Sequence, residues 1–348
     1  MSKRLLFITP IFPQNASEDA VVPFIFQFAQ QFGKDKEVTI DVISLMYPFS
    51  TKPYAINDIT VYPIGSRFRK SIRKIPFLCK AIFKGIQLCR KNKYDGVVCF
   101  WYIESALVGN IISHLFQKKM VVWMLGQDIN KDNAYLKLLK IPKEKLVMIS
   151  LQQSEHFYNN HKIKVDRIAD VAINRAVFPE FNLGERKIDV LGVGNLGALK
   201  NYTLFIEILS MLENKNCKAV IIGEGEELED LKAKANQYGL ANNILLTGAL
   251  SHKEVLNYMN NAKVFLHTSK SEGSGTVLQE ALYSGCQVVS TIAVENTETL
   301  DQFYFSLNKE DLSAKVSAYL NHPNIPKRTE HFKMEDTISV IYKAFYKD

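Results

Sequence analysis

The chain has 348 residues, of which 47% are apolar and 23% charged, a composition typical of a globular chain and not of a disordered one. This length is too great for one ordinary hydrophobic core and indicates two domains. The net charge of +7 is unevenly shared, because residues 1–178 carry 26 Lys and Arg against 14 Asp and Glu, whereas residues 179–348 carry 17 against 22. No window approaches the roughly 18 uninterrupted apolar residues of a membrane-spanning helix.

The first ten residues contain a short apolar run that stops at Pro10 and lacks a small-residue cleavage site, so they are predicted to form a β-strand and not a signal peptide. The five cysteines are scattered and include no Cys-x-x-Cys pair, as expected for reduced thiols in a cytosolic protein. Asp-x-Asp, His-x-x-x-His and His-Glu-x-x-His spacings do not occur, and the sequence therefore predicts no metal site.

In the first half of the chain, short β-branched runs alternate with longer helical patterns. Strands are predicted at 5–9, 38–44, 96–100, 119–124 and 146–150, and helices at 23–32 and 104–115. Apolar strands joined by helical crossovers predict a parallel sheet that is covered on both faces.

A basic segment runs from Arg67 to Lys93 and holds ten Lys and Arg, no acid and several interleaved apolar residues. It is typical of a basic amphipathic helix, which suits an anionic membrane surface. Its candidate membrane or acceptor surface consists of Arg67, Arg69, Lys70, Arg73, Lys74, Lys80 and Lys84. The alternative is a solvated helix face whose apolar side lies in the core. A nucleic-acid partner is a third alternative, which no recognised motif supports.

The second half repeats the scheme, with strands predicted at 188–192, 219–222, 244–247, 264–267 and 287–290 and helices at 202–213, 227–238, 253–259 and 277–283. Residues 179–187 are polar and broken by Pro and Gly, and are predicted to be a linker. The predicted fold class is α/β, with two doubly wound Rossmann-like domains, residues 1–178 and 188–332, facing each other across a cleft. Ligands of such sheets bind at the carboxyl ends of the strands.

The most informative segment is Ser271–Leu282, where a Gly-x-Gly turn separates Glu272 from Glu280, eight positions later. An apolar strand runs into this turn and an amphipathic helix runs out of it, which is how a fold presents backbone N–H groups to a phosphate. A Glu inside such a helix would repel a phosphate but can accept hydrogen bonds from sugar hydroxyls. The segment therefore predicts a site for a molecule with both phosphates and sugars, a nucleotide-sugar.

Two further glycine turns follow predicted strands. The loop from Gly194 to Lys200 offers backbone N–H groups and one mobile ammonium to a diphosphate, although taken alone it fits an ordinary strand-to-helix turn equally well. The turn at Gly223 and Gly225 is rich in acids that suit a helix N-terminus, and its own residues favour a structural role.

From about Val190 to Thr291 the chain resembles the donor domain of the retaining glycosyltransferases of family 4, which have the GT-B architecture. The matching landmarks, in order, are Gly194…Lys200-Asn201, Gly223-Glu224-Gly225-Glu226, Thr247-Gly248-Ala249-Leu250 and Ser269…Glu272-Gly273-Ser274-Gly275…Glu280. The resemblance implies that Glu280 holds the ribose, that Glu272 and the N–H groups after it contact the sugar and the diphosphate, and that Lys200 contacts the phosphates. It also implies that residues 333–348 form a helix that crosses back onto the first domain.

The donor-binding residues that follow from this resemblance are Gly194, Asn195, Lys200, Gly223, Gly225, Leu250, Glu272, Gly273, Ser274, Gly275, Thr276 and Glu280. Asn195 stands where the family often has Arg, and Ser274 where an aromatic residue or leucine is usual. Leu125 occupies the position of a family His, so a role that needs that imidazole is closed here. Asp128 has two interpretations. It is a third candidate catalytic residue in addition to Lys200 and Glu272, binding donor or acceptor hydroxyls together with Gln127, or it is a carboxylate that caps the next helix.

The activity implied is retaining, metal-independent transfer of a hexose from a UDP- or GDP-sugar to a hydroxyl of a lipid-linked or polysaccharide precursor, including lipopolysaccharide. The enzyme is then cytoplasmic and peripheral on the inner face of the cell membrane. A non-catalytic nucleotide-sugar-binding protein and another GT-B enzyme, such as an epimerase, are the alternatives. A nicotinamide-dependent oxidoreductase is disfavoured because Pro10-Ile11-Phe12-Pro13 follows the first strand, where a tight Gly-x-Gly-x-x-Gly turn is needed.

Overall fold

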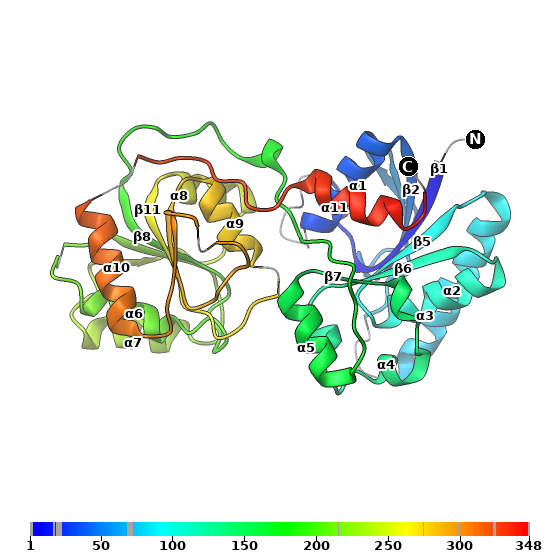
Figure 1. The fold of residues 1–348 in the computed structure, drawn as a ribbon, viewed down its shortest axis with the longest axis horizontal. Helices are drawn as coiled ribbons and strands as arrows, with labels where there is room; N and C mark the ends of the chain where they lie inside the picture. Colours follow the sequence, from blue (N-terminus) through cyan, green and yellow to red (C-terminus); the bar gives the residue numbers. More distant parts are fainter. Residues whose placement is uncertain are drawn as a thin grey trace. The chain divides into compact units, whose positions relative to one another are not determined.

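The computed structural model describes residues 3–16, 18, 23–67, 72–214, 216–273, 275–297, 299–322 and 325–346 (Figure 1). The chain divides into two compact units, Met1–Asn174 with Lys333–Asp348, and Arg175–Phe332. Each unit has its own sheet with helices on both faces, so the expected fold class of two doubly wound α/β domains is confirmed.

The sheet of the first unit has the strand order β3-β4-β2-β1-β5-β6-β7, and every neighbouring pair is parallel except β3 and β4. The strands are β1 (Lys3–Ile11), β2 (Val38–Tyr47), β3 (Tyr54–Ile56), β4 (Ile59–Pro63), β5 (Gly96–Phe100), β6 (Lys119–Met124) and β7 (Leu146–Met148). The helices are α1 (Pro23–Lys36), α2 (Ile75–Lys91), α3 (Glu104–Leu115), α4 (Ala134–Leu139), α5 (Leu151–His161) and α11 (Met334–Lys343).

The central strands of this sheet are buried on both faces because successive side chains point to opposite sides. Helix α1 covers one face with Ile25, Phe28, Ala29 and Phe32, which share one side of a helix at their spacing. The rings of Phe28 and Phe32 pack on those of Phe7, Phe100 and Trp123. Each such ring removes enough apolar surface from water to stabilise the fold by about 2–3 kcal/mol.

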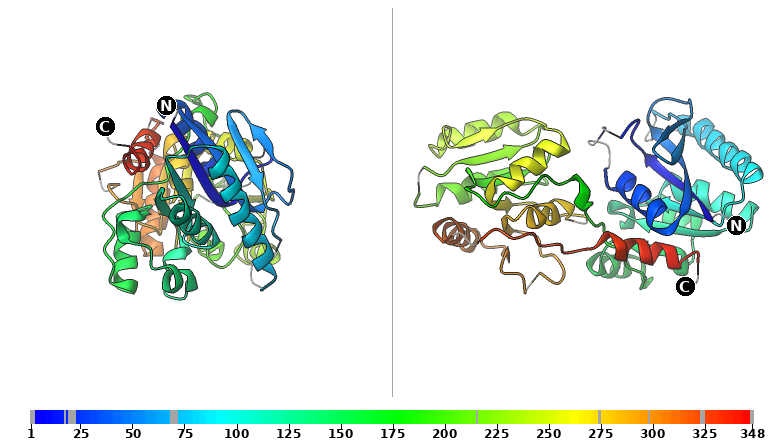
Figure 2. Two further views of the ribbon diagram at one scale, coloured as in Figure 1. Left: turned by 90° about the vertical axis from the view of Figure 1, so that its right-hand side faces the viewer. Right: turned by 90° about the horizontal axis from the view of Figure 1, so that it is seen from above.

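The C-terminal helix α11 packs on the first unit, alongside α1 (Figure 2). Lys3 donates a hydrogen bond to the Tyr342 hydroxyl at 2.7 Å, and Lys119 donates one to the carbonyl oxygen of Phe345 at 2.6 Å. A side chain at Gly96 would collide with the Phe345 ring, so this glycine makes room for the helix. These contacts assign the end of the chain to the unit in which the chain begins.

The sheet of the second unit is entirely parallel, with the order β10-β9-β8-β11-β12-β13. Its strands are β8 (Ile188–Val193), β9 (Ala219–Ile222), β10 (Ile244–Leu246), β11 (Ala262–His267), β12 (Gln287–Ser290) and β13 (Phe303–Phe305). Its helices are α6 (Tyr202–Ser210), α7 (Leu228–Gln237), α8 (His252–Asn260), α9 (Thr276–Tyr283) and α10 (Lys309–Asn321). The strand order runs outwards in both directions from β8 and β11, which is the order of a Rossmann fold.

Residues 179–187, the predicted linker, belong to the second unit, and the division between the units falls after Asn174. Arg186 is only 4% exposed, and its guanidinium donates to the carbonyl oxygens of Ala262 and Ser284, both at 2.8 Å. The Asn182 amide N–H donates to the side chain of Asn260 at 3.1 Å. Buried carbonyl groups at the start of β11 and the end of α9 need donors, and Arg186 supplies them.

Candidate functional site

The candidate site lies at the carboxyl ends of β8 and β11, the two neighbouring strands at which the strand order reverses. In open α/β sheets the connections leave such a pair in opposite directions, and ligands bind in the resulting crevice. Lys200 follows β8 and Glu272 follows β11. The topology therefore brings together two residues that are 72 positions apart in the sequence.

Hydrogen bonds fasten the loop after β8 to the segment after β11. The Thr268 hydroxyl donates to the carbonyl oxygen of Lys200 at 3.0 Å, and the Lys270 amide N–H donates to that of Leu199 at 2.8 Å. A Cβ on Gly194 would lie 3.1 Å from Cε of Lys200, so the lysine side chain runs over this glycine. The backbone that carries Lys200 is consequently held in place by the neighbouring strand.

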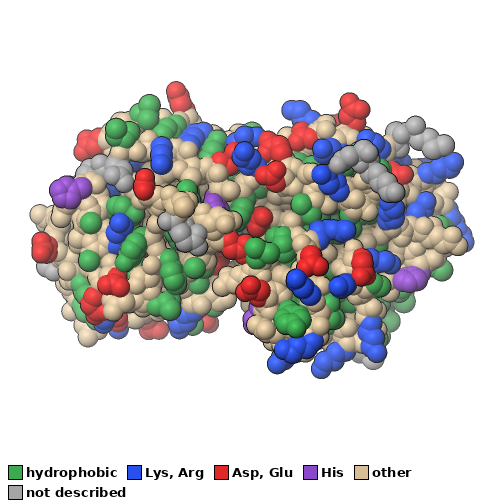
Figure 3. Space-filling model, in the orientation of Figure 1, with side chains coloured by type: hydrophobic (Ala, Val, Ile, Leu, Met, Phe, Trp, Pro, Cys, Tyr) green, Lys and Arg blue, Asp and Glu red, His purple; other side chains and the backbone are tan. Residues whose placement is uncertain are grey.

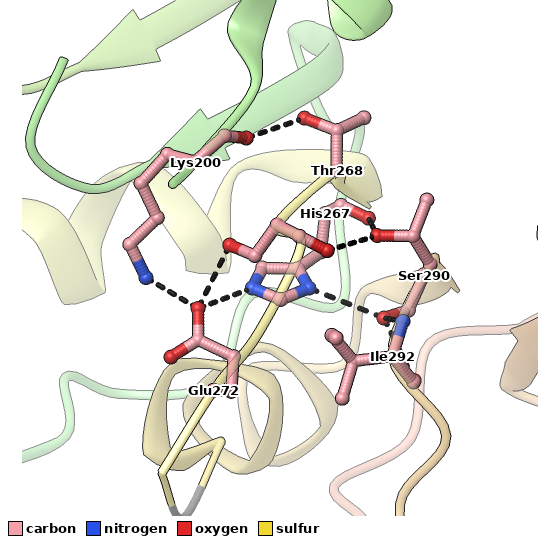
Figure 4. A network of polar contacts seen from close by, with 8 residues as sticks. Lys200, His267, Thr268, Glu272, Ser290 and Ile292 are labelled. Carbon is pink, nitrogen blue, oxygen red and sulfur yellow. Dashed lines mark hydrogen bonds and ion pairs between the residues drawn. The ribbon is translucent and has the colours of Figure 1, made fainter. Parts of the chain in front are cut away.

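Glu272 is the centre of a polar network (Figure 4). Its Oε1 atom forms an ion pair with Lys200 Nζ, lies 2.9 Å from His267 Nε2, and accepts a hydrogen bond from the Ser269 hydroxyl at 2.8 Å. The other ring nitrogen of His267 lies 3.2 Å from Ser290 Oγ. Two of the three predicted catalytic residues, Lys200 and Glu272, are thus in direct contact.

The network keeps the Glu272 carboxyl group ionised. Burial raises the pKa of this group, but the hydrogen bond from His267 and the charge of Lys200 lower it further than burial raises it, to about 2. Burial and the nearby negative charge of Glu272 raise the pKa of the Tyr202 hydroxyl. At neutral pH the site therefore holds an ionised Glu272 and a neutral Tyr202.

The glycine turn after β9 supports the loop after β8. A Cβ on Gly223 would lie 1.8 Å from the carbonyl oxygen of Gly194, and one on Gly225 would lie 2.4 Å from that of Leu196. The Leu196 amide N–H donates to the Glu224 carbonyl at 2.8 Å. The contacts of Gly223 and Gly225 are thus those of close backbone packing, the role that their own turn favours in the sequence.

Helix α9 begins at Thr276, directly after Gly275, whose φ of +59° lies in the left-handed region that favours glycine. Gly273 is exposed, and Ser274 lies outside the described residues. Glu280 lies on α9 with its Oε1 2.8 Å from Nε2 of His252, the first residue of α8. Both side chains retain some exposure, so the Glu280 carboxylate is held in one orientation while still accessible.

The remaining predicted donor residues have weaker links to this network. Asn195 is exposed on the loop after β8, and no described residue bonds its side chain. Leu250 packs against the apolar cluster beneath α8 and α9. These positions border the site but do not join the network.

In the first unit, Asp128 is buried and far more constrained than an open binding residue. Its carboxylate accepts hydrogen bonds from the amide N–H groups of Tyr102 at 2.7 Å, Gly126 at 2.9 Å and Leu125 at 3.2 Å. Burial raises the pKa of this carboxyl to about 6, although the backbone donors act to lower it. Asp128 therefore ties the ends of β5 and β6 together and does not cap the next helix, α4, whose N-cap is Asn133.

We expect Asp128→Ala to destabilise the protein by about 1–3 kcal/mol, because it leaves buried N–H groups without an acceptor. The shift in the urea unfolding midpoint measures this loss, and Asp132→Ala, at a surface acid on the following loop, is the matched control. A stable Asp128→Ala protein that has lost its activity would contradict the structural role and restore the catalytic alternative.

Three residues of the candidate site escaped the sequence-based prediction: His267 and Ser269, which contact Glu272, and His252, which contacts Glu280. His267 is the last residue of an apolar strand, where a polar side chain only 3% exposed needs a partner, and this was the available signal. Ser269 begins the family motif that contains Glu272 and Glu280, but the sequence alone indicates no role for it. The pairing of His252 with Glu280 carries no sequence signal, because it depends on how α8 packs on α9.

Residues 174–333, a range that contains the whole network, match the family model of the glycosyl transferases group 1. The second unit of the chain is thus similar to the glycosyl transferases group 1. This match confirms the resemblance drawn from Glu272, Glu280 and the glycine turns, and it covers the unit that carries them.

Relatives of this family resemble parts of the chain. A Campylobacter jejuni N-acetylgalactosaminyltransferase that acts on N-acetylgalactosamine-N,N'-diacetylbacillosaminyl-diphospho-undecaprenol is 28% identical over 236 residues, which cover 63% of this chain and 62% of the relative. The gpi3 subunit of the Schizosaccharomyces pombe phosphatidylinositol N-acetylglucosaminyltransferase is 28% identical over 163 residues, which cover 44% of this chain and 36% of the subunit. The chain thus spans less than two thirds of the length of these relatives.

The fold also matches solved glycosyltransferase structures over almost its full length. The Anabaena HepE structure in complex with UDP-glucose has a TM-score of 0.67 and 13% identity, covering 98% of this chain and 95% of that one. At this identity the likeness establishes the shared fold of two Rossmann-like domains.

Over the described part of the chain, no three or more His, Cys, Asp and Glu side chains gather as a metal would require. None of the helices described is both long enough and apolar enough to span a bilayer.

Proposed function

We propose that this chain is a retaining, metal-independent glycosyltransferase that moves a hexose from a nucleoside diphosphate sugar to an acceptor hydroxyl. The observation that carries the proposal is the convergence of Lys200 and Glu272 at the reversal point of a Rossmann-type sheet. One group has the charge that a diphosphate requires, and the other accepts hydrogen bonds as sugar hydroxyls require. The family of the second unit supports the same reaction class.

In this proposal the donor spans the carboxyl end of the sheet. Its diphosphate lies at Lys200 and at the N-terminal end of α9, where backbone N–H groups and the helix dipole favour negative charge. Glu280 accepts hydrogen bonds from the ribose hydroxyls, and Glu272 accepts them from the transferred sugar. The diphosphate is then a second anion that competes with Glu272 for the Lys200 ammonium.

The reaction proceeds on one face of the sugar. The bond between the anomeric carbon and the diphosphate oxygen breaks, a bond to the acceptor oxygen forms, and the departing phosphate takes the acceptor proton. Lys200 and the α9 N-terminus stabilise the charge that develops on the leaving group, as preorganised dipoles and cations do in other transfer reactions. The acceptor is a lipid-linked or polysaccharide precursor, a proposal supported by the undecaprenol-linked substrate in the name of the Campylobacter relative.

A thermal-shift panel of UDP-, GDP- and ADP-sugars tests donor binding. A donor present at 100 times its Kd stabilises the fold by about 2.7 kcal/mol, enough for a clear shift of Tm. Transfer of labelled sugar to a lipid extract, with and without EDTA, then separates the enzyme from a non-catalytic binding protein, and the anomeric configuration of the product tests retention. Absence of a Tm shift with every donor would contradict donor binding. A product with inverted anomeric configuration would contradict the retaining mechanism, and loss of transfer in EDTA would contradict metal independence.

We also propose that helix α2 places the first unit on an anionic membrane surface. Lys and Arg are more frequent on the visible face of this unit than on that of the second unit (Figure 3). Ile75, Cys79 and Phe83 form an exposed stripe at i, i+4 and i+8 on α2, with Ile75 50% and Phe83 68% exposed. An exposed apolar stripe on a helix that also carries exposed cations is suited to the boundary between headgroups and acyl chains.

The predicted basic residues contribute to this surface unequally. Arg73 and Lys80 are exposed, Lys84 lies over the ring of Tyr62, and Arg67 lies over that of Phe49. Lys74 instead forms an ion pair of 2.7 Å with Glu104, so its charge is already neutralised. Arg69 and Lys70 lie outside the described residues.

We expect Phe83→Ser to weaken binding to vesicles of phosphatidylglycerol about tenfold or more, because it removes the largest exposed apolar side chain of α2 from the membrane boundary. Co-sedimentation at low salt measures this effect. Leu115→Ser is the matched control, since Leu115 is 61% exposed on another helix of the same unit. Equal binding by the parent protein and Phe83→Ser, or equal binding to neutral vesicles, would contradict the membrane assignment.

A further inference from the structure

The two carboxylate oxygens of Glu272 have different surroundings (Figure 4). Oε1 receives all three of the contacts recorded for this side chain, from Lys200, His267 and Ser269. Oε2 receives no hydrogen bond from any residue that the structure describes, and it is not among the polar atoms that are fully buried without a partner. One oxygen therefore anchors the side chain while the other stays available.

The three anchors differ in how firmly they are held. Lys200 has a flexible side chain, and the diphosphate of the proposed donor attracts its charged end. His267 is 3% and Ser269 1% exposed, so neither can leave its position to contact a ligand. The His267 ring stacks beside Phe265 at an interplanar angle of 18°, and its Nδ1 lies 3.2 Å from Ser290 Oγ, which in turn accepts the Ile292 amide N–H at 2.9 Å.

This difference matters once the donor binds. When Lys200 turns toward the diphosphate, the half-buried Glu272 carboxylate loses its ion-pair partner. Burial alone disfavours a charged carboxylate, and a side chain without its anchor is no longer held in one orientation. Contacts that persist in the bound state are therefore needed to keep Glu272 charged and aimed.

We propose that His267, assisted by Ser269, is a positioning residue that holds Oε1 of Glu272 so that Oε2 accepts a hydroxyl of the transferred sugar. This role rests on the proposed function, since it concerns recognition of the sugar part of the same donor. Nε2 of His267 carries the proton that it donates to Oε1. His267 therefore affects binding of the sugar, while Lys200 and α9 bind the diphosphate independently of it.

The test compares each nucleotide-sugar with its own nucleoside diphosphate, UDP-glucose against UDP and likewise for the GDP and ADP pairs, by calorimetry. For the pair that the parent protein binds, His267→Leu should raise the Kd of the nucleotide-sugar about 10- to 100-fold, the range for loss of a hydrogen bond to a charged group. The Kd of the nucleoside diphosphate should change less than about twofold. His267→Gln, whose side-chain N–H can reach Oε1, should recover most of the loss. His322→Leu, at an exposed histidine of the same unit, is the control.

Equal weakening of both ligands, or no weakening of either, would overturn the positioning role, as would failure of His267→Gln to recover more than His267→Leu. If His267→Leu does not fold, Ser269→Ala carries the test and must show the same selective loss of the nucleotide-sugar, several-fold in size. If the parent protein binds no member of any pair, the proposed function itself is wrong. If the parent binds both ligands of a pair and the variant binds them equally well, only the positioning role is wrong.

Discussion

Lys200→Ala is expected to lower kcat for sugar transfer by about 10²- to 10³-fold, with a smaller change in the donor KM. The ammonium meets the charge that develops on the diphosphate as it leaves, and removal of one such preorganised group from an active site has a cost of this size. Steady-state rates at saturating donor, measured with the acceptor identified by the lipid-extract assay, give the comparison.

Lys263→Ala is the matched control for this change. Lys263 also pairs with a carboxylate in the second unit, Asp189, at 2.7 Å, but it lies near the start of β11, at the end of the sheet away from Lys200. Its loss should leave kcat within about twofold, since it touches neither donor nor acceptor in the proposed site. Comparable rates for Lys200→Ala and the parent would remove Lys200 from the reaction.

Glu280→Ala is expected to raise the donor KM about 10- to 100-fold and to leave kcat nearly unchanged. In the proposed site the ribose hydroxyls donate hydrogen bonds to Glu280 and lie away from the bond that breaks, so we expect them to be bound equally in the ground state and the transition state. The size follows from the loss of one or two hydrogen bonds to a charged acceptor. Initial rates as a function of donor concentration separate the two parameters.

The contact between Glu280 and His252 gives a second way to check this assignment. His252 holds the carboxylate at 2.8 Å, and the Ser251 and Glu254 capping box fixes the end of α8 from which His252 projects. His252→Leu should therefore raise the donor KM less than Glu280→Ala, while Glu229→Ala, at an exposed acid on α7, should have no effect. A fall in kcat at unchanged KM in Glu280→Ala would place Glu280 at the reacting centre instead of the ribose.

The sequence predicted the second unit better than the first because its functional chemistry is local. Glu272 and the glycine turn follow strand β11 directly, and Glu280 lies on the next helix, α9. The strand, the turn and the helix each have a strong periodic or conformational signal. Gly275 adopts φ +59° and Gly223 lies against the Gly194 carbonyl, so these positions require glycine for reasons that a single sequence can suggest.

Features that depend on contacts between distant residues escaped prediction. The short hairpin of β3 and β4 turns at Asn57, whose φ is +52°, and each strand is too brief for an alternating pattern to show. Strand β13 has three residues, and its place at the edge of the sheet is fixed only by pairing with β12. Arg186 looked like part of a polar linker, yet burial against the Ala262 and Ser284 carbonyls ties it to the second unit.

The candidate site shows the same division. Lys200 and Glu272 were each predicted to contact the donor, but their ion pair, and the role of His267 in the same network, follow from the adjacency of β8 and β11. The two departures from the family pattern remain: Leu125 is half-buried in the first unit, and Asn195 is exposed in the second. In the proposed site Lys200 is therefore the one cation assigned to the phosphates, which makes its substitution the most informative one.

A crystal structure of the protein with the nucleotide-sugar that gives the largest thermal shift tests the central claim most directly. We expect the diphosphate to lie beside Lys200 Nζ and the N-terminal end of α9, with the ribose hydroxyls hydrogen-bonded to Glu280. A hydroxyl of the transferred sugar should donate to Oε2 of Glu272, while His267 still donates to Oε1. A nucleotide bound elsewhere, or bound here with Lys200 still paired to Glu272 and both carboxylates turned away from it, would contradict the account.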